Sequence, residues 1–321
     1  MSALTRRVVL AGLASFGMLP PLARSQEQAL KIVYPYAAGG SGDAIARMMA
    51  EQLQKNLGRS VIVENKTGAG GRIGAQVVKE SPPDGSTLLF GAAALFTLQP
   101  HVLSNLGYDP LADFAPVSRI VKFDQALVVS SQVPARSIKE LAVWLKSNPD
   151  EAAFGSPGVG TGAQLAVLKF ARTFGIELRH LPYRGTPAAL PDLLAGRLPI
   201  YVASSAELIE HHRNGGIRIL ATTGGARLGM LPDIPTLKES GVDIEAPGWF
   251  AFYAPVATPP AVLQRLEKEI AAAAAAPAIQ ARIAALGFQP TDTTTDDLKR
   301  VQRAEFDAWA TVVKATGFKP E

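Results

Sequence analysis

The stretch PYAAGGSGDAIARMMAE, residues 35–51, places glycines, a serine and an aspartate between an apolar run and a segment with helical spacing. The run LKIVYPY (30–36) is rich in β-branched and aromatic residues, which predicts a strand. Apolar residues recur at helical intervals from Asp43 to Leu57 and predict a helix over 43–57. A strand, a glycine-rich turn and a helix in this order indicate a parallel α/β unit with the turn at the carboxyl end of the strand.

The rest of the chain alternates short β-rich runs with helical runs, which predicts an α/β fold throughout. Further strands are expected at 60–65, 86–93, 125–131, 177–183, 198–204 and 217–223, and further helices at 73–79 and 259–276. Aromatics and prolines bracket two extended stretches, 117–131 and 246–260, which we interpret as crossings between two lobes. The predicted first lobe therefore contains residues 26–124 and 246–321, and the second contains residues 125–245.

The first 25 residues have the pattern of an export signal. Arg6 and Arg7 form its basic start, residues 8–19 are apolar, and Ser25 suits cleavage before Gln26. The arginine pair leaves both the Sec and the Tat route open. A membrane anchor is the alternative, but a bilayer span needs roughly 20 apolar residues. We therefore expect an exported protein.

Composition excludes several classes of function. The chain has 32 Lys and Arg against 28 Asp and Glu, and residues 1–25 hold three arginines and no acid. The mature chain is therefore near neutral, at 29 against 28, so its charge gives no reason to expect nucleic acid or a membrane surface as a partner. Cysteine is absent from the sequence, which excludes disulfides and thiolate chemistry.

Three glycine-rich segments each follow an expected strand and precede an expected helix: 37–43, 67–74 and 155–164. The start of a helix has unpaired backbone N–H groups and a partial positive charge, so such loops can bind anions. Each loop alone is more typical of a turn than of a ligand site. Together, on two lobes that face each other, they predict a cleft in which backbone amides hold a small carboxylate.

A nucleotide site is the alternative interpretation of the third loop. The segment GVGTGA (158–163) matches the dinucleotide-binding pattern except that Ala163 stands where the last glycine belongs, and alanine is sometimes accepted there. The alternative function is therefore an exported oxidoreductase that binds a nucleotide cofactor at this loop.

Other catalytic motifs are incomplete. A nucleophile elbow at Gly39 and Ser41 would need glycine at position 43, which is Asp43, and the sequence has no P-loop. Arg72 and Arg184 fit a ligand anion and a solvated or structural role equally well. The histidines lack metal-ligand spacing: His101, His180, His211 and His212.

Seven motifs occur in order from about residue 30 to the C-terminus: VYPYAAGGSGDAIARMMAEQL, VIVENKTGAGGRIGAQVV, PPDGSTLLFG, GSPGVGTGAQLAVLKF, HLPYRGTPAALPDLLAGRL, LPDIPTLKESG and GWFAFYAPVATPPAVLQRLEKEI. This series resembles the substrate-binding receptors of tripartite tricarboxylate transporters, the Bug-type proteins. The resemblance implies a periplasmic, two-lobed, type II (Venus-flytrap) binding protein, α/β in class, in which each lobe is a mixed, mainly parallel sheet flanked by helices.

The resemblance also implies a function. We expect a non-catalytic monomer, without cofactor or metal ion, that captures a small carboxylate and delivers it to the membrane permease subunits of a transporter. A periplasmic sensor built on the same scaffold is a further alternative.

The resemblance implies ligand contacts at fourteen positions: Tyr36, Ala38, Gly39, Gly40, Ser41, Asp43, Ala93, Ser156, Gly160, Thr161, Tyr183, Gly185, Thr186 and Ala203. The chain departs from the family pattern at Ala38, at residues 92–94, at Gln164, and at Ala203, where an acid often stands. These changes predict a less polar pocket without an acid for an ammonium group. We therefore expect a dicarboxylate or an aromatic acid rather than an amino acid.

Overall fold

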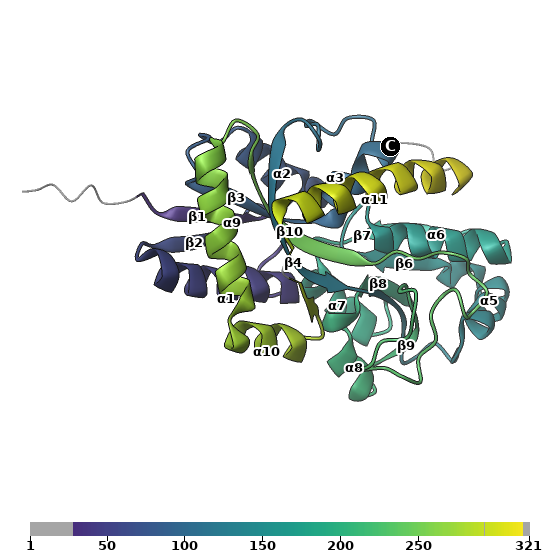
Figure 1. Cartoon of the computed structure of the whole chain (residues 1–321). Coiled ribbons are helices and arrows are strands. Elements are labelled where there is room, and N and C mark those ends of the chain that lie inside the picture. Colours follow the sequence, from purple (N-terminus) through teal and green to yellow (C-terminus); the bar gives the residue numbers. More distant parts are fainter. Residues whose placement is uncertain (1–27, 292, 317–321) are drawn as a thin grey trace, which may run out of the picture.

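The computed structural model describes residues 28–291 and 293–316, and the predicted export signal lies outside them. The strands of this part of the chain form two sheets, one in each of two lobes (Figure 1). None of the described helices is long and apolar enough to cross a membrane.

The first sheet has the strand order β11-β4-β10-β3-β1-β2. Its lobe is built from β1 (Leu30–Tyr34), α1 (Ser41–Leu57), β2 (Val61–Asn65), a 3-10 turn (Ala69–Gly71), α2 (Arg72–Lys79), β3 (Thr87–Ala92), α3 (Ala93–Thr97), α4 (Gln99–Val102) and β4 (Phe114–Phe123). The chain returns to this lobe with β10 (Gly248–Pro255), α9 (Pro260–Ala275), α10 (Pro277–Ala285), β11 (Gln289–Pro290) and α11 (Thr295–Thr316).

The second sheet has the order β7-β6-β8-β5-β9. Its lobe contains β5 (Gln125–Ser130), α5 (Ile138–Ser147), a 3-10 turn (Pro149–Glu151), β6 (Ala153–Ser156), α6 (Gly162–Phe174), β7 (Arg179–Pro182), α7 (Thr186–Leu194), β8 (Ile200–Ser204), a 3-10 turn (Ser205–Glu207), α8 (Ile209–Arg213) and β9 (Ile217–Thr222). The strands of the two sheets fall within the predicted lobes, and the lobe boundaries themselves stay a prediction.

Strand pairing explains why the cleft loops lie where they do. β1 pairs in parallel with β2 and β3, and β6 pairs in parallel with β7 and β8, so the turns after these strands emerge at one edge of each sheet. The long strands β4, β5 and β10 pair antiparallel with their neighbours. Among the described strands five of the nine pairings are antiparallel, which corrects the expectation of mainly parallel sheets to mixed ones.

Continuous apolar strands form the two cores. All residues of β8 and β10 are buried, as expected for strands covered by helices on both faces. Helix α1 buries Ile45, Met49 and Leu53, which lie four residues apart and therefore share one face. The helix ends at Gly58, whose left-handed backbone (φ 66°) closes the last turn through its N–H group. Local sequence pattern and packing thus agree in this unit.

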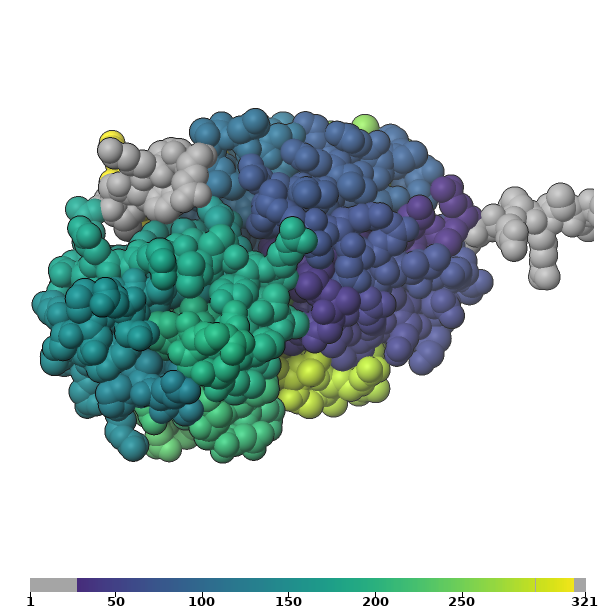
Figure 2. Space-filling view, turned by 180° about the vertical axis from the view of Figure 1, so that it is seen from behind, coloured from purple at the N-terminus to yellow at the C-terminus, as the bar shows by residue number. Residues whose placement is uncertain are grey.

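The lobes touch directly along a seam (Figure 2). The first crossing is very short, because Asp124 is the single residue between β4 and β5. Helix α11 also spans the two lobes: its Val313 packs in one cluster with Leu98 of the first lobe and Leu165 of α6, and Figure 1 shows α11 lying along α6.

The carboxyl group of Asp124 is poorly solvated at this crossing. Burial, together with the nearby carboxylate of Glu245, raises the pKa of Asp124 to about 6. Because the folded-state pKa lies above the unfolded value, the side chain favours folding at low pH, and this contribution is lost as the pH rises through about 6.

We predict that Asp124→Asn raises the free energy of unfolding at pH 8 by about 1–2 kcal/mol, because the amide avoids placing a charge there. Denaturant unfolding of both proteins at several pH values measures this. The difference between them should vanish below pH 4. A difference that does not change with pH would contradict the explanation.

Candidate functional site

A cleft lies between the two lobes where four strand-to-helix turns meet. The turns are β1 to α1, β3 to α3, β6 to α6 and β7 to α7, and each contributes to the lining: Tyr36, Ala37, Gly40, Ala92, Ala93, Ala94, Pro157, Thr161, Gly162, Ala163, Gly185, Thr186 and Pro187. The cleft has a free volume of about 100 Å³. On this measure a single water needs roughly 10–15 Å³, so the cleft has room for a small molecule.

Aromatic and small apolar side chains form most of the remaining wall. Tyr34 and Phe250 come from the first sheet, Phe123 from the end of β4, and Trp309 from α11. The two phenylalanine rings stack with their centroids 5.1 Å apart. Trp309 also packs against the core of the second sheet, so the C-terminal helix helps to close the cleft.

Few polar side chains reach the cleft, and each is mostly buried. Gln125, Ser204 and Glu207 come from the second lobe. Ser204 Oγ is buried and has no hydrogen-bond partner within residues 28–291 and 293–316. None of the described lining residues is Lys, Arg or His. Positive potential in the cleft therefore comes from backbone N–H groups at helix starts.

Glu207 joins the two lobes across the cleft. Its Oε1 accepts a hydrogen bond from the backbone N–H of Ser41, the first residue of α1, at 3.1 Å. Its Oε2 accepts a hydrogen bond from the hydroxyl of Thr186, the first residue of α7. Burial raises the pKa of Glu207, although these hydrogen bonds oppose the shift.

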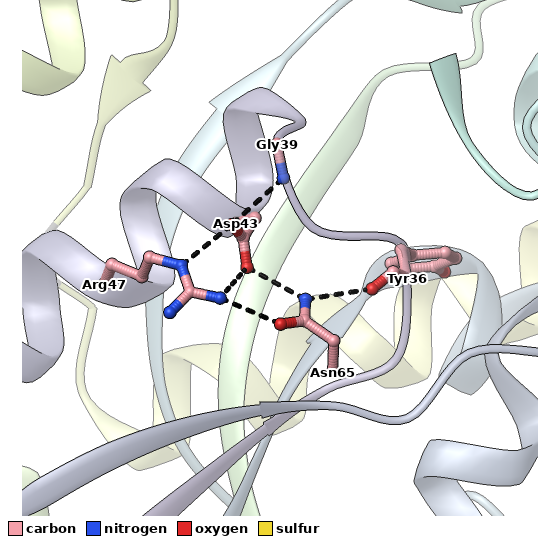
Figure 3. Close-up of polar contacts among 5 residues, drawn as sticks. All are labelled: Tyr36, Gly39, Asp43, Arg47 and Asn65. Atoms are coloured by element: carbon pink, nitrogen blue, oxygen red, sulfur yellow. Dashed lines mark hydrogen bonds and ion pairs between the residues drawn. The ribbon is translucent and has the colours of Figure 1, made fainter. Parts of the chain in front are cut away.

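Asp43 organises the loop after β1 (Figure 3). Its carboxylate accepts hydrogen bonds from Gly39 N–H (3.1 Å), Arg47 Nε (2.9 Å) and Asn65 Nδ2 (2.9 Å). The Asn65 amide also donates to the carbonyl of Tyr36 at 3.1 Å. Burial by itself would raise the pKa of Asp43, but these hydrogen bonds and the charge of Arg47 lower it. Asp43 therefore fixes the loop from behind and does not line the cleft.

The second and third glycine-rich loops pack against each other across the seam. A Cβ on Gly70 would lie 2.7 Å from the carbonyl oxygen of Val159, and the left-handed φ of 66° also favours glycine there. The side-chain amide of Gln99 donates to the carbonyl of Gly70 at 2.9 Å. The two loops are therefore in close backbone contact at Gly70 and Val159.

The third loop is held from within by His180. The amide Nε2 of Gln164 lies 3.1 Å from His180 Nδ1, and Ser156 Oγ lies 2.7 Å from His180 Nε2. The Gln164 amide donates, so Nδ1 accepts and Nε2–H donates to the serine, whose own hydroxyl donates to the carbonyl of Gly158. Burial lowers the pKa of His180 to about 4. A histidine that donates to the serine is not positioned to act as its general base.

Of the fourteen predicted contact residues, the structure brings six to the cleft: Tyr36, Gly40, Ala93, Thr161, Gly185 and Thr186. Ala38 and Gly39 are exposed on the turn, Ser41 takes part through the N–H group held by Glu207, and Asp43 lies behind the loop. Ser156 and Gly160 are buried within the third loop, and Ala203 is buried in the core of the second sheet.

A second, larger hollow of about 750 Å³ adjoins the cleft and shares Tyr36 and Pro157 with it. Tyr183, Arg72 and Arg184 line this hollow and not the cleft. The hydroxyl of Tyr183 donates to Asp192 at 3.0 Å. The guanidinium of Arg72 donates to the carbonyls of Ala69 and Asn105, which supports its structural interpretation.

Several lining residues were missed by the sequence reasoning: Tyr34, Phe123, Gln125, Ser204, Glu207, Phe250 and Trp309. All of them lie outside the glycine-rich segments, so no local pattern marks them. Glu207 carried one signal, since it closely follows a strand, β8, that points its end at the cleft.

Comparison with known proteins gives concordant results. The family model described as tripartite tricarboxylate transporter family receptor matches residues 45–318. The protein BugT of Bordetella pertussis is 32% identical over 322 residues, which cover 98% of this chain and 99% of BugT.

Solved structures share the two-lobed fold. The periplasmic binding protein BugD is 32% identical, with a TM-score of 0.87 over 92% of this chain and 99% of that one. An R. palustris protein with adipate is 30% identical, with a TM-score of 0.86 over 91% and 98%. MatC from Rhodopseudomonas palustris with bound malate is 26% identical, with a TM-score of 0.84 over 89% and 98%. The predicted periplasmic binding protein fold is thereby confirmed.

We predict that Asp43→Asn weakens ligand binding at least tenfold. The substitution removes the charge-assisted hydrogen bond that the N–H group of Gly39 donates to the carboxylate, and this bond holds the loop that contains Gly40 and leads into α1. Calorimetric titration and thermal melting of the variant measure affinity and stability together. As a matched control, Arg47→Gln leaves the bonds from Gly39 and Asn65 in place and should have a smaller effect. A fall in melting temperature without loss of affinity would reduce Asp43 to a structural role.

Proposed function

Since the chain belongs to the tripartite tricarboxylate transporter receptor family, we propose that it captures a small carboxylate in the interlobe cleft and delivers it to the membrane subunits of such a transporter. Members of this family are receptors and not enzymes, which removes the oxidoreductase alternative. The arrangement of Ser156 and His180 is consistent with a receptor.

One observation carries the proposal: turns from both lobes direct helix starts at one cleft. The N-terminus of α6 is the clearest example, because Thr161, Gly162 and Ala163 all line the cleft. The N–H groups at a helix start attract negative charge, and the unpaired hydroxyl of Ser204 adds a buried donor. A carboxylate satisfies both.

The size of the cleft supports a small acid. Its free volume of about 100 Å³ is several times the roughly 10–15 Å³ that one water needs on this measure. Adipate and malate, the acids present in two of the similar structures, are small acids of this kind. The expectation of a dicarboxylate or an aromatic acid stays a prediction.

Binding is proposed to act through closure. A ligand that contacts both lobes binds the closed form better than the open form and so shifts the population toward it. The contact between Gly70 and Val159 belongs to the closed form, since it joins loops of opposite lobes. An export signal at residues 1–25 would bring the receptor to the periplasm, where it would meet its carboxylate ligand.

We predict that the mature protein binds at least one acid from a panel of succinate, malate, adipate, benzoate, glutamate and 4-aminobutanoate. Isothermal titration calorimetry gives the affinity, and a ligand at 100 times its Kd should stabilise the fold by about 2.7 kcal/mol. If no acid gives heat or a rise in melting temperature, the proposed function is wrong.

We predict that Gly70→Ala weakens binding at least tenfold, because the added methyl group meets the Val159 carbonyl when the lobes close. Gly58→Ala is a matched control: its φ is also 66°, but no atom lies within 4 Å of the added Cβ. Both variants bear the cost of left-handed alanine, about 1–2 kcal/mol. Equal affinity of the two variants would argue against closure at this contact.

A further inference from the structure

We propose that Glu207 makes the cleft selective for carboxylates that also have an ammonium group, that is, amino acids in the broad sense, over plain mono- and dicarboxylates. This inference rests on the proposed function, because it names the chemical class that the same cleft prefers. It reverses the expectation drawn from Ala203, since the acid that is missing at position 203 is supplied by Glu207.

Glu207 occupies an anion site that would otherwise be open to a ligand. Helix α1 has 17 residues and starts at Ser41, whose N–H group is bound by Glu207 Oε1 at 3.1 Å. Gly40 makes the approach possible, because a Cβ at that position would lie 2.8 Å from the same oxygen. The N–H group of Gly39 is likewise taken by Asp43. Two N–H groups between β1 and α1, those of Gly39 and Ser41, are therefore already bound by the carboxylates of Asp43 and Glu207.

Among the described residues, the Glu207 carboxylate has no positively charged partner. Its contacts are the N–H group of Ser41 and the hydroxyl of Thr186, which in turn accepts a hydrogen bond from the hydroxyl of Tyr201 at 3.2 Å. Among the described residues that line the cleft, none is cationic. The two carboxylate oxygens have about four acceptor positions, and the N–H group of Ser41, its side chain and the hydroxyl of Thr186 use up to three of them, so the carboxylate can accept a further donor.

The charges in the cleft define what fits. A dicarboxylate would bring a second negative charge close to a buried carboxylate, which low-dielectric surroundings make costly. An ammonium group placed beside Glu207 offsets that carboxylate instead, and burial then strengthens the pair. The ligand carboxylate would then bind at the start of α6 and at Ser204. Ser204 is 8% exposed, and its Oγ has no hydrogen-bond partner in the described chain.

The test compares matched acids that differ by an ammonium group. Glutamate is paired with glutarate, and 4-aminobutanoate with butanoate, so that the ammonium group is tested both beside the carboxylate and at the far end. Calorimetry at pH 7.5 should show at least a tenfold preference for the amino acid in one of the pairs. Glu207→Gln should weaken binding of that amino acid at least tenfold more than it changes binding of the plain partner.

A neighbouring variant controls for general effects. Glu210 lies at the exposed start of α8 and forms an ion pair with Arg213. Glu210→Gln removes this carboxylate and should leave the preference for the amino acid unchanged. Melting temperatures of both variants check the fold, and Glu207→Asp, which keeps the charge, should retain part of the preference.

The outcomes separate the two proposals. Plain acids that bind the wild type as tightly as the amino acids, or a preference that survives Glu207→Gln, would overturn the role of Glu207 and leave carboxylate capture standing. Absence of binding by all four acids and by the other acids named above would overturn both.

Discussion

Backbone N–H groups at the starts of α1, α6 and α7 bring partial positive charge to both sides of one cleft, and the rest of the site is arranged around that charge. Because no described lining residue is cationic, negative groups in the cleft can be stabilised only by these N–H groups and by neutral donors. The carboxylate of Glu207 accepts a hydrogen bond from the N–H group at the start of α1, and the start of α6 lines the cleft. Recognition by main-chain groups also explains the glycines, since a side chain at Gly40 would block the approach.

Two contacts described above join the lobes across the seam, and they would form on the proposed closure. Gly70 and Val159 meet backbone to backbone, and Glu207 spans from Ser41 to Thr186. The contact between Gly70 and Val159 has no side-chain entropy to lose, because backbone atoms make it, whereas the contact made by Glu207 orders a long side chain. The loops themselves are stiffened from outside the cleft, the first by Asp43 and the third by His180.

The sequence predicted the elements well because their signals are local: strand composition, helical spacing and the glycine turn around Gly40 all lie within short segments. It predicted the cleft only where turns supply the lining. Phe123 and Trp309 lie far apart along the chain and meet only after the sheets and α11 are assembled. Ala203 was assigned to the cleft by motif, but the alternation of side chains along β8 turns it into the core. The acid was sought there and is found instead at Glu207, after the strand ends.

The position of Trp309 has a practical consequence. Its indole is attached to the C-terminal helix of one lobe, packs on the core of the other and borders the cleft. Occupation of the cleft therefore alters the polarity around an intrinsic fluorophore. The fluorescence of Trp309 can therefore be used to follow ligand binding without dyes or labels.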